Sequence, residues 1–598
     1  MSKTLSLEQL NTLEPSQVLP LLQGLYEHSD WIVEQTLNQR PFKSFEAFKY
    51  GMIKTLEQSG EDAWLKLIKA HPELTGKVAL QKELTAESQS EQQRAGLGNC
   101  SPEEYEALHR LNKAYQDKFG FPFIVAVRGP RGLGLTRGEI IRTMERRLKN
   151  SRPFEIQEAL RQIHRIVELR LQEKTGTQTI EGDLIWDWQE ELAQFSEVQE
   201  ANPPNLTVTY LSPAHQQCAT LIAQRMRECG FDEVSQDAVG NVIGRYRGQD
   251  PQAKYLMTGS HFDTVRNGGK YDGRLGIFCP MACVRTLFNQ GVRLSYGIEV
   301  VAFAEEEGQR FAATFLASSA LCGQFNPSWL EQVDTQGTSM RQAMQTYGLK
   351  PEEIPLIARN PNDYLGFIEV HIEQGPVLYN QGLPLGLVTS INGSRRYLAK
   401  VKGVASHAGT TPMSLRHDAV SAVAELALFM EQRAREDADS VATMGMLEVP
   451  NGSINVIAAQ AHFSMDIRAP NDLQRDAVVS SILKKIEDIS DRRQVEFTLE
   501  ESLKVSAAPC DKHLKCKWQQ AIEHLGIELL ALPSGAGHDA MKMHDILPQA
   551  MLFVRGLNSG ISHNPLESTS SSDMQLAYLA MMHVLNQLQD TASLAKPV

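Results

Sequence analysis

The strongest constraint on the fold is a change in hydrophobic periodicity between residues 173 and 183. Before this point, apolar residues recur every three or four positions, as in EEYEALHRLNKAYQDKF and EIQEALRQIHRIVELRLQ, which indicates amphipathic helices. The segment EKTGTQTIEGD interrupts this pattern and collects glycine and threonine. The 598-residue chain also exceeds what one hydrophobic core organises, about 250–300 residues. We therefore expect several domains, the first an all-α domain at residues 1–175.

After the interruption, helices alternate with short β-rich segments. KYLMTGSH and GIEVVAFAEEEG are typical of strands, and AHQQCATLIAQRMRECG of a helix. This alternation predicts an α/β domain, which we place at residues 180–389 and 501–598. Between these parts, SRRYLAKVKGVASHAG and INVIAAQAHFSMDIRAP surround the long helical segment SLRHDAVSAVAELALFMEQRARE. They predict an inserted α+β domain at residues 390–500.

Composition and charge exclude several classes of function. The chain has 59 Lys and Arg against 72 Asp and Glu, a formal charge of −13, with no long run of either sign. Binding to nucleic acid or to an anionic membrane surface is therefore disfavoured. The N-terminal sequence lacks the apolar core of a signal peptide, and no segment approaches the ~18 apolar residues of a membrane span. We expect a cytoplasmic protein whose 8 cysteines, none in a CxxC pair, are neither disulfide-bonded nor zinc ligands.

Residues that suit a metal site lie in loops or where strand-like segments end. GSHFDTVRNGGKYDGRLG contains His261 and Asp272, and the other candidates are Glu306, Glu307, His371 and His563. Any one histidine is more often an ordinary buried or surface residue, so the prediction of a metal site depends on all six residues together. Two ions about 3.5–4 Å apart need a shared ligand, and a carboxylate can offer one oxygen to each. Asp272 is the expected bridge, because the glycines around it let the loop turn tightly.

Seven motifs in a fixed order extend this prediction: GSHFDTVRNGGKYDGRLG, AEEEGQRF, EVHIEQGPVL, VASHAGTTPM, SINVIAAQ with SMDIRAP, SGAGHDAM and GISHNPLE. Together they resemble the dinuclear-metal amidohydrolases related to aminoacylases and carboxypeptidases. Within that family they most resemble the branch of allantoate amidohydrolases and N-carbamoyl-L-amino acid hydrolases. The resemblance spans about residues 180–598. It implies two divalent ions, manganese or zinc, small ureide substrates, and an inserted domain that makes the chain a homodimer.

The same resemblance implies a role for each matched residue. His261 and His371 would bind one ion, Glu307 and His563 the other, with Asp272 bridging the two. Glu306 would be the general base on the attacking water, and Asp263 would orient the His261 ring. The matched substrate-contacting positions are Gln374, His407, Asn455, Arg468 and His538. Of these, His407 together with Asn455 and Arg468 would complete the site of the partner subunit.

The helical region carries a second set of motifs, namely HPELTGK, ESQSEQQRAGL and KFGFPFIVAVRG. Taken separately, they indicate only that His71, which precedes Pro72, is a loop or helix-start residue and that FPFIVAV is a buried apolar segment. Combined, they resemble 2-oxo-4-hydroxy-4-carboxy-5-ureidoimidazoline (OHCU) decarboxylase over about residues 5–172. The resemblance implies that His71 is the catalytic acid or base and that no cofactor is needed, since the conjugated substrate accepts the electrons. The implied substrate contacts are Pro72, Ser88, Glu91, Gln92, Phe123, Ile124, Val125, Ala126 and Val127.

Two functions follow from these resemblances. The first is a bifunctional enzyme of purine catabolism, which decarboxylates OHCU to (S)-allantoin and hydrolyses allantoate to ureidoglycine, ammonia and CO2. The alternative is an N-carbamoyl-L-amino acid hydrolase whose helical region is an assembly module without catalysis. A decarboxylase that makes allantoin on the same chain favours allantoate as the second substrate, by association rather than by geometry. The intervening reaction is absent from the chain, so direct channelling does not follow.

Overall fold

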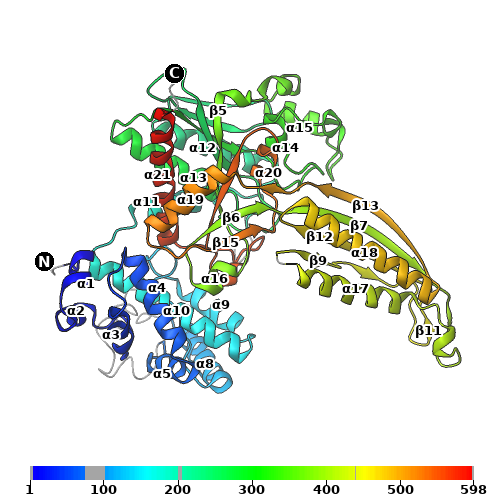
Figure 1. The fold of residues 1–598 in the computed structure, drawn as a ribbon, viewed down its shortest axis with the longest axis horizontal. Helices are drawn as coiled ribbons and strands as arrows, with labels where there is room; N and C mark the ends of the chain where they lie inside the picture. Colours follow the sequence, from blue (N-terminus) through cyan, green and yellow to red (C-terminus); the bar gives the residue numbers. More distant parts are fainter. Residues whose placement is uncertain (1–3, 75–100, 199–204, 438, 595–598) are drawn as a thin grey trace.

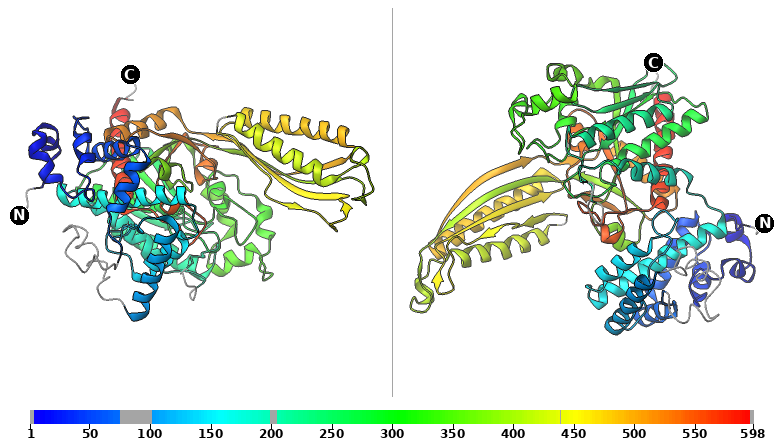
Figure 2. Two further views of the ribbon diagram at one scale, coloured as in Figure 1. Left: turned by 90° about the horizontal axis from the view of Figure 1, so that it is seen from below. Right: turned by 180° about the vertical axis from the view of Figure 1, so that it is seen from behind.

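The computed structural model describes residues 4–74, 101–198, 205–437 and 439–594. A helical region and a long arm project from different sides of a large α/β body (Figures 1 and 2). The helical region is formed by the described residues as far as Thr175, and the arm by residues between the two parts of the α/β body. Among the described helices, none has the length and apolar character that crossing a membrane requires.

The helical region has its own apolar core, built around side chains such as Phe48, Tyr115 and Phe121. Its longest described helices are well delimited: Ser101 and Glu104 form a capping box at the start of α8, and Gly120 ends that helix in a left-handed conformation. Gly176 ends α10 in the same way, which explains the loss of periodicity there. The described helices are α1 (Leu7–Thr12), α2 (Pro15–Leu22), α3 (Trp31–Leu37), α4 (Phe45–Gln58), α5 (Glu61–Ala70), α8 (Pro102–Phe119), α9 (Arg137–Arg147) and α10 (Arg152–Thr175).

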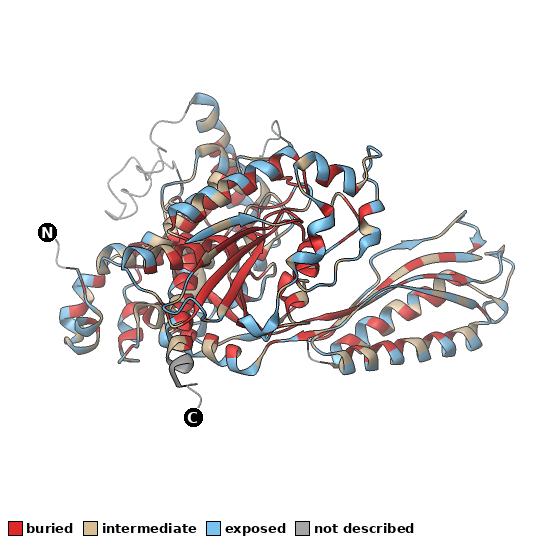
Figure 3. Cartoon of the chain, turned by 90° about the horizontal axis from the view of Figure 1, so that it is seen from above, coloured by how far each residue is buried: buried red, intermediate tan, exposed pale blue. Residues whose placement is uncertain are grey.

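The α/β body is organised around a mixed sheet whose described strands have the order β1-β2-β4-β3-β5-β16-β6-β14, with β15 beside β6. The central strands β4, β3, β5 and β16 run parallel to one another. β4 and β16 are buried along their whole length, which fits a sheet covered on both faces (Figure 3). The strands are β1 (Glu233–Gln236), β2 (Val242–Tyr246), β3 (Tyr255–His261), β4 (Gly297–Phe303), β5 (Tyr364–Ile372), β6 (Leu385–Ile391), β14 (Ala508–Pro509), β15 (Ala531–Ser534) and β16 (Gln549–Val554).

Helices and short 3-10 turns surround this sheet. The final helix, α21, packs against α11, α13 and α19, so it joins the first and last parts of the body. The helices are α11 (Ile180–Leu192), α12 (Pro213–Glu228), α13 (Arg274–Asn289), α14 (Leu316–Leu321), α15 (Met340–Tyr347), α16 (Val377–Gln381), α19 (Lys512–His524), α20 (Asp539–Met543) and α21 (Ser571–Leu594). The 3-10 turns are η2 (Pro327–Glu331), η3 (Pro351–Ile357), η4 (Pro361–Asp363) and η6 (Asn558–Gly560).

The arm is a second, antiparallel sheet with two long helices on one face. The order of its described strands is β10-β12-β7-β13, with β9 also paired to β12. Burial alternates along β12, because every second side chain packs under the helices. The elements are β7 (Gly393–Lys402), β8 (Ser406–His407), η5 (Met413–Leu415), α17 (Ala419–Glu436), β9 (Val441–Thr443), β10 (Leu447–Glu448), β11 (Val456–Ile457), β12 (Gln460–Ala469), α18 (Asp472–Arg493) and β13 (Glu496–Val505).

One expected boundary of the arm is wrong. We expected the inserted segment to end at residue 500, but β13 stays paired with β7 as far as Val505, opposite Ser394. A register shift between Glu501 and Leu503 lets the ladder continue past the polar run EES. That run interrupts the apolar alternation, which is why the sequence pattern suggested an earlier end. The chain returns to the large sheet only at β14.

Candidate metal centre

The predicted metal ligands meet at one edge of the large sheet. β4, β3 and β5 are parallel neighbours, so their carboxyl ends lie together. His261 is the last residue of β3, Glu306 follows β4, and His371 lies next to the last position of β5. Asp272 lies two residues before the first residue of α13, Arg274. The intervening Gly273 has φ +69°, and a Cβ there would lie 2.5 Å from the carbonyl oxygen of His261, so glycine allows this close approach.

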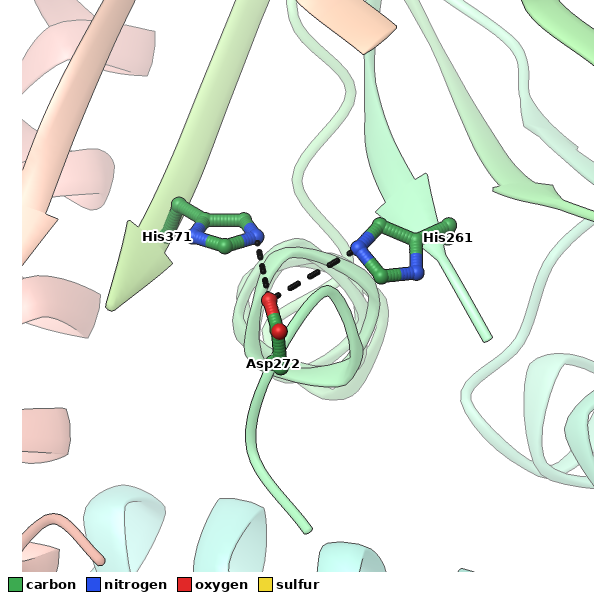
Figure 4. Close-up of side chains that lie close together, drawn as sticks. All are labelled: His261, Asp272 and His371. Atoms are coloured by element: carbon green, nitrogen blue, oxygen red, sulfur yellow. Dashed lines mark ion pairs between the residues drawn. The ribbon is translucent and has the colours of Figure 1, made fainter. Parts of the chain in front are cut away.

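The first group of ligand atoms surrounds one oxygen of Asp272 (Figure 4). Its Oδ1 atom lies 3.2 Å from Nε2 of His371 and 3.7 Å from Nε2 of His261. The other ring nitrogens face backbone carbonyls, at 2.9 Å for His371 with Ile372 and 3.1 Å for His261 with Asp263. When these Nδ1 atoms carry the ring protons, both Nε2 atoms keep a lone pair beside Asp272, and Nε2 of His371 also accepts the backbone N–H of Gly273 at 3.1 Å.

The second group uses the other oxygen of the same carboxylate. Nε2 of His563 lies 3.1 Å from Oδ2 of Asp272 and 3.5 Å from Oε1 of Glu307. Gln374 donates from Nε2 to that Oδ2 atom at 3.0 Å. Asp272 therefore belongs to two potential metal-binding groups at once, within each of which the ligand atoms lie no more than 4.8 Å apart. The His563 side chain is 49% exposed, so this side of the centre is open.

The charges of the centre fit a pair of cations. Oδ1 of Asp272 is buried and accepts no hydrogen bond from any residue that the structure describes. Burial, together with the neighbouring Glu307, raises the pKa of Glu306 well above its ordinary value. Although burial opposes it, the carboxylates of Asp263 and Asp272 raise the pKa of His261 well above its ordinary value. A proton and a metal ion compete for the same lone pairs, so this negative site favours divalent cations.

Asp263 ties two of the strand ends together. Its carboxylate accepts hydrogen bonds from the backbone N–H of Glu306 at 3.1 Å and of Glu307 at 3.2 Å. One of its oxygens also lies 3.3 Å from Nδ1 of His261. The predicted orienting residue thus contacts the His261 ring and the backbone that carries the expected general base.

Two buried carboxylates near the centre were missed by sequence reasoning. Glu567 accepts the backbone N–H of Tyr271 at 2.9 Å and of Asp272 at 3.1 Å, and the hydroxyl of Ser562 at 2.6 Å. Glu369 of β5 accepts the hydroxyl of Ser260, in the neighbouring strand β3, at 2.7 Å. Glu567 closes the motif GISHNPLE and Glu369 opens EVHIEQGPVL, so each lies in a motif whose histidine had drawn attention.

The predicted substrate contacts are divided between the α/β body, which holds Gln374 and His538, and the arm. His538 is buried and lies edge-on to His371, with ring centres 4.4 Å apart. Arg468 lies at the root of the arm, where Nη1 donates to the carbonyl oxygen of Gly535 at 2.6 Å and Nη2 to Asp466 at 2.7 Å. Gln374, already placed in the second ligand group, is the only one of these positions to contact Asp272 directly among the described residues.

His407 and Asn455 lie at the opposite end of the arm from Arg468. Here β8 pairs with β11 beyond the far end of β12 (Figure 1). The 10-residue strand β12 alone spans about 30 Å. The structure therefore does not bring these two residues to the metal centre of their own chain. Nδ1 of His407 accepts the N–H groups of Gly409 at 3.1 Å and Thr410 at 3.2 Å, so its Nε2 carries a proton and faces outward as a donor.

In the helical region, His71 follows α5 and is buried, with Nδ1 3.0 Å from the carbonyl oxygen of Leu67. Burial lowers the pKa of His71 to about 4, so the ring is neutral near pH 7. Pro72 adjoins it, and the predicted contacts Phe123, Ile124, Val125, Ala126 and Val127 form a buried segment. Three further predicted contacts, Ser88, Glu91 and Gln92, lie outside the described residues.

Comparison with known proteins agrees with both sets of motifs. Residues 257–587 match the profile of peptidase family M20/M25/M40. The chain belongs to this family. The M20 part is 37% identical over 409 residues to an N-carbamoyl-L-amino acid amidohydrolase of Geobacillus stearothermophilus, covering 68% of this chain and 99% of that protein. It is 35% identical over 411 residues to allantoate deiminase 1 of Glycine max, covering 64% of this chain and 85% of that protein.

Solved structures support the same assignment for the M20 part. A hydantoinase/carbamoylase family amidase from Burkholderia multivorans has a TM-score of 0.64 and 28% sequence identity, covering 70% of this chain and 98% of its own. Ahead of the M20 part, residues 11–172 match the profile of OHCU decarboxylase. Both family resemblances inferred from the motifs are therefore confirmed.

Proposed function

We propose that this chain is a bifunctional enzyme. Its helical region decarboxylates OHCU to (S)-allantoin, and its M20 part hydrolyses allantoate to ureidoglycine, ammonia and CO2. The hydrolase half is supported above all by the Asp272 carboxylate, which presents one oxygen to each of two ligand groups beside Glu306. The decarboxylase half is supported by the family match over residues 11–172 and by the buried, neutral His71.

Two divalent cations held by these groups would polarise the ureido carbonyl and lower the pKa of an attacking water. Glu306 takes the proton of that water and returns it to the leaving nitrogen, so that one carboxylate serves first as base and then as acid. Asp263 holds the backbone of Glu306 in place during both transfers. Arg468 pairs with a substrate carboxylate from the root of the arm.

The hydrolase acts as a homodimer in this proposal. The outward Nε2–H of His407 suits an oxyanion donor, but the arm holds it away from its own Asp272. The tip of the arm also exposes several apolar side chains: Val404, Met413, Leu415, Ile454 and Val456. We infer that a second copy receives this tip, so that His407 and Asn455 complete the partner's site.

In the decarboxylase half, His71 delivers one proton to one face of the substrate after CO2 leaves. The substrate's own C=N and C=O bonds accept the electron pair that the broken C–C bond leaves behind. The buried segment from Phe123 to Val127 keeps the substrate carboxylate poorly solvated, which favours its loss. A single proton donor on one face accounts for a chiral product.

A second candidate for the M20 part is an N-carbamoyl-L-amino acid hydrolase, which the 37% identity to such an enzyme favours. Allantoate and N-carbamoyl amino acids both place a ureido group near a carboxylate. The experiment is to measure kcat/KM for both with metal-loaded protein, by ammonia release. We expect allantoate to be the better substrate; a large preference for N-carbamoyl amino acids would establish the second candidate instead.

A further inference from the structure

We propose that the helical region is a positioning element of the hydrolase's second metal site, acting through Arg146 of α9 and Glu158 of α10. These residues brace the two loops that carry His563 and Gln374. The inference rests on the dinuclear centre proposed above. In this inference, the helical region of the fused chain helps to hold residues of the hydrolase's metal site in position. No direct transfer of substrate between the two enzymes is implied.

The loop that carries His563 is closed on itself. At its ends, the N–H of Leu557 donates to the carbonyl oxygen of Ser568 at 2.7 Å. Across its middle, Nδ2 of Asn558 donates to the carbonyl oxygen of Leu566 at 2.7 Å. His563 itself is half-exposed and has a left-handed φ of 53°, so little packing fixes its ring. Its position therefore depends on the shape of the loop.

The helical region reaches into this loop through Arg146. Nη2 of Arg146 donates to Oδ1 of Asn558 at 3.2 Å, across 412 positions of sequence. The Asn558 amide therefore bonds to α9 through its oxygen and to the far side of the loop through its nitrogen. Loss of the arginine would leave that amide held through its nitrogen alone among the described contacts, and the loop would lose this bond to the helical region.

A second brace holds the neighbouring loop. Gln374 is followed by α16, whose first N–H groups, of Val377 at 2.7 Å and Leu378 at 2.8 Å, are capped by the Glu373 carboxylate. From α16, the Tyr379 hydroxyl donates to the buried Glu158 of α10 at 2.7 Å.

Arg161 strengthens this second brace. Its guanidinium lies 4.7 Å from the ring centre of Tyr379 and donates to Oδ1 of Asn380 at 2.9 Å. Two consecutive residues at the end of α16 are thus held by the same turn of α10.

The two braced loops touch each other through their backbones. A Cβ at Gly560 would lie 1.7 Å from the carbonyl oxygen of Gly375, so the chains approach as closely as glycine permits. At the metal centre the same loops meet again, where Nε2 of Gln374 lies 3.3 Å from Nε2 of His563. A shift in either loop is therefore passed to the other.

This arrangement predicts a different effect on each ion. His261 and His371 lie in strands of the buried sheet, and neither residue contacts the helical region in the part of the chain that the structure describes. His563 and Glu307 lie in loops, and only the loop of His563 reaches the helical region in the described contacts. Loss of Arg146 should therefore weaken the second ion and leave the first unchanged.

Other contacts keep the helical region docked when Arg146 is removed. Nη1 of Arg165 donates to the Ser572 hydroxyl at 2.9 Å, and Gln172 donates to the same hydroxyl at 3.0 Å. The Ser44 hydroxyl bonds to the carbonyl oxygen of Leu525 at 2.5 Å. A change at Arg146 therefore tests the brace rather than the attachment of the helical region.

The test is to titrate metal-free, full-length protein with Mn²⁺ and to determine both dissociation constants. Arg146→Ala is compared with Arg142→Ala, an exposed arginine one turn earlier on the same helix. For Arg146→Ala we expect the second dissociation constant to rise about threefold to tenfold, the first to stay the same, and the melting temperature of the metal-free protein to hold. Arg142→Ala should match wild type, Arg146→Lys should recover part of the loss, and Tyr379→Phe should reproduce it.

Two outcomes would overturn the proposal. One is wild-type binding of both ions by Arg146→Ala and Tyr379→Phe. The other is an equal loss of both ions, which would indicate general damage instead of positioning. If wild-type protein itself binds only one Mn²⁺, the dinuclear centre fails, and this inference fails with it.

Discussion

Oδ1 of Asp272 lies 3.2 Å from Nε2 of His371, yet that oxygen accepts no hydrogen bond from any described residue. In the neutral ring whose single proton lies on Nδ1, which the 2.9 Å contact with the carbonyl oxygen of Ile372 favours, Nε2 turns a lone pair toward this oxygen. Two lone-pair atoms that face each other in a buried place are stabilised by a cation. The relative position of Asp272 and His371 is therefore the main support for a metal centre at this site.

Replacement of the shared carboxylate should affect both ions. Asp272→Asn exchanges one oxygen for an NH2 group that repels a cation and removes the negative charge shared by both groups, so one group loses a ligand and the other is left with a weaker, neutral one. We expect metal content to fall from about two ions per chain to fewer than one, measured by elemental analysis after dialysis. The exposed Asp363→Asn serves as the matched control and should keep full content. Two retained ions in Asp272→Asn would refute the bridging role.

The adjacent glutamates should differ in effect. Glu306→Gln removes the base but keeps the ligands, so we expect metal content to hold while kcat for ureide hydrolysis falls by about 10²–10⁴-fold. Glu307→Gln should instead lose the second ion. Steady-state kinetics together with metal analysis separates the two, and a Glu306→Gln enzyme with normal kcat would remove that residue from the mechanism.

Mixing two inactive variants tests whether His407 acts on the partner subunit. In a dimer of one Glu306→Gln chain and one His407→Ala chain, one site carries both changes and the other carries neither. An equal mixture that exchanges subunits should therefore recover about one quarter of wild-type activity. Each variant alone should stay inactive. If the mixture gains nothing after exchange, His407 does not act across the dimer.

The two catalytic halves should fail independently. His71→Ala should abolish decarboxylation of OHCU, followed by absorbance, and leave allantoate hydrolysis within about twofold of wild type. A chelator should have the opposite effect, because no metal is expected in the decarboxylase. Loss of both activities in His71→Ala, with metal content unchanged, would contradict this separation.

His71 should also make stability depend on pH. Its pKa is lowered by burial from 6.5 to about 4, so above pH 6.5 it is neutral in both the folded and unfolded states. As pH falls from 6.5 toward 4, the unfolded state takes up the proton first, and stability is lost, by up to about 3 kcal/mol. In urea unfolding of the metal-free proteins, we expect the free energy of unfolding of wild type, relative to that of His71→Asn, to fall as the pH is lowered across this window. A constant difference would show that His71 is not buried as a neutral ring.

The sequence predicts the parts of this molecule that depend on local pattern. The helical start, the α/β body and both families follow from periodicity and from short motifs. His261, Asp272 and His371 were recoverable because each lies in a glycine-rich or strand-end motif. Their meeting at one edge also follows from the parallel order of β4, β3 and β5.

What the sequence does not reveal depends on long-range packing. The contact between Arg146 and Asn558 joins residues 412 positions apart, and neither residue lies in a motif of the centre. The role of Glu567 is likewise hidden, since it acts by accepting backbone N–H groups near residue 272. The separation of His407 from Arg468 reflects the length of the paired strands, which the motifs around each residue do not record.

The most direct test is anomalous X-ray diffraction from crystals of Mn²⁺-loaded wild-type protein. The account predicts two anomalous peaks about 3.5–4 Å apart, one on each oxygen of the Asp272 carboxylate, the first beside His261 and His371 and the second beside Glu307 and His563. A single peak, or two peaks that do not share this carboxylate, would contradict it.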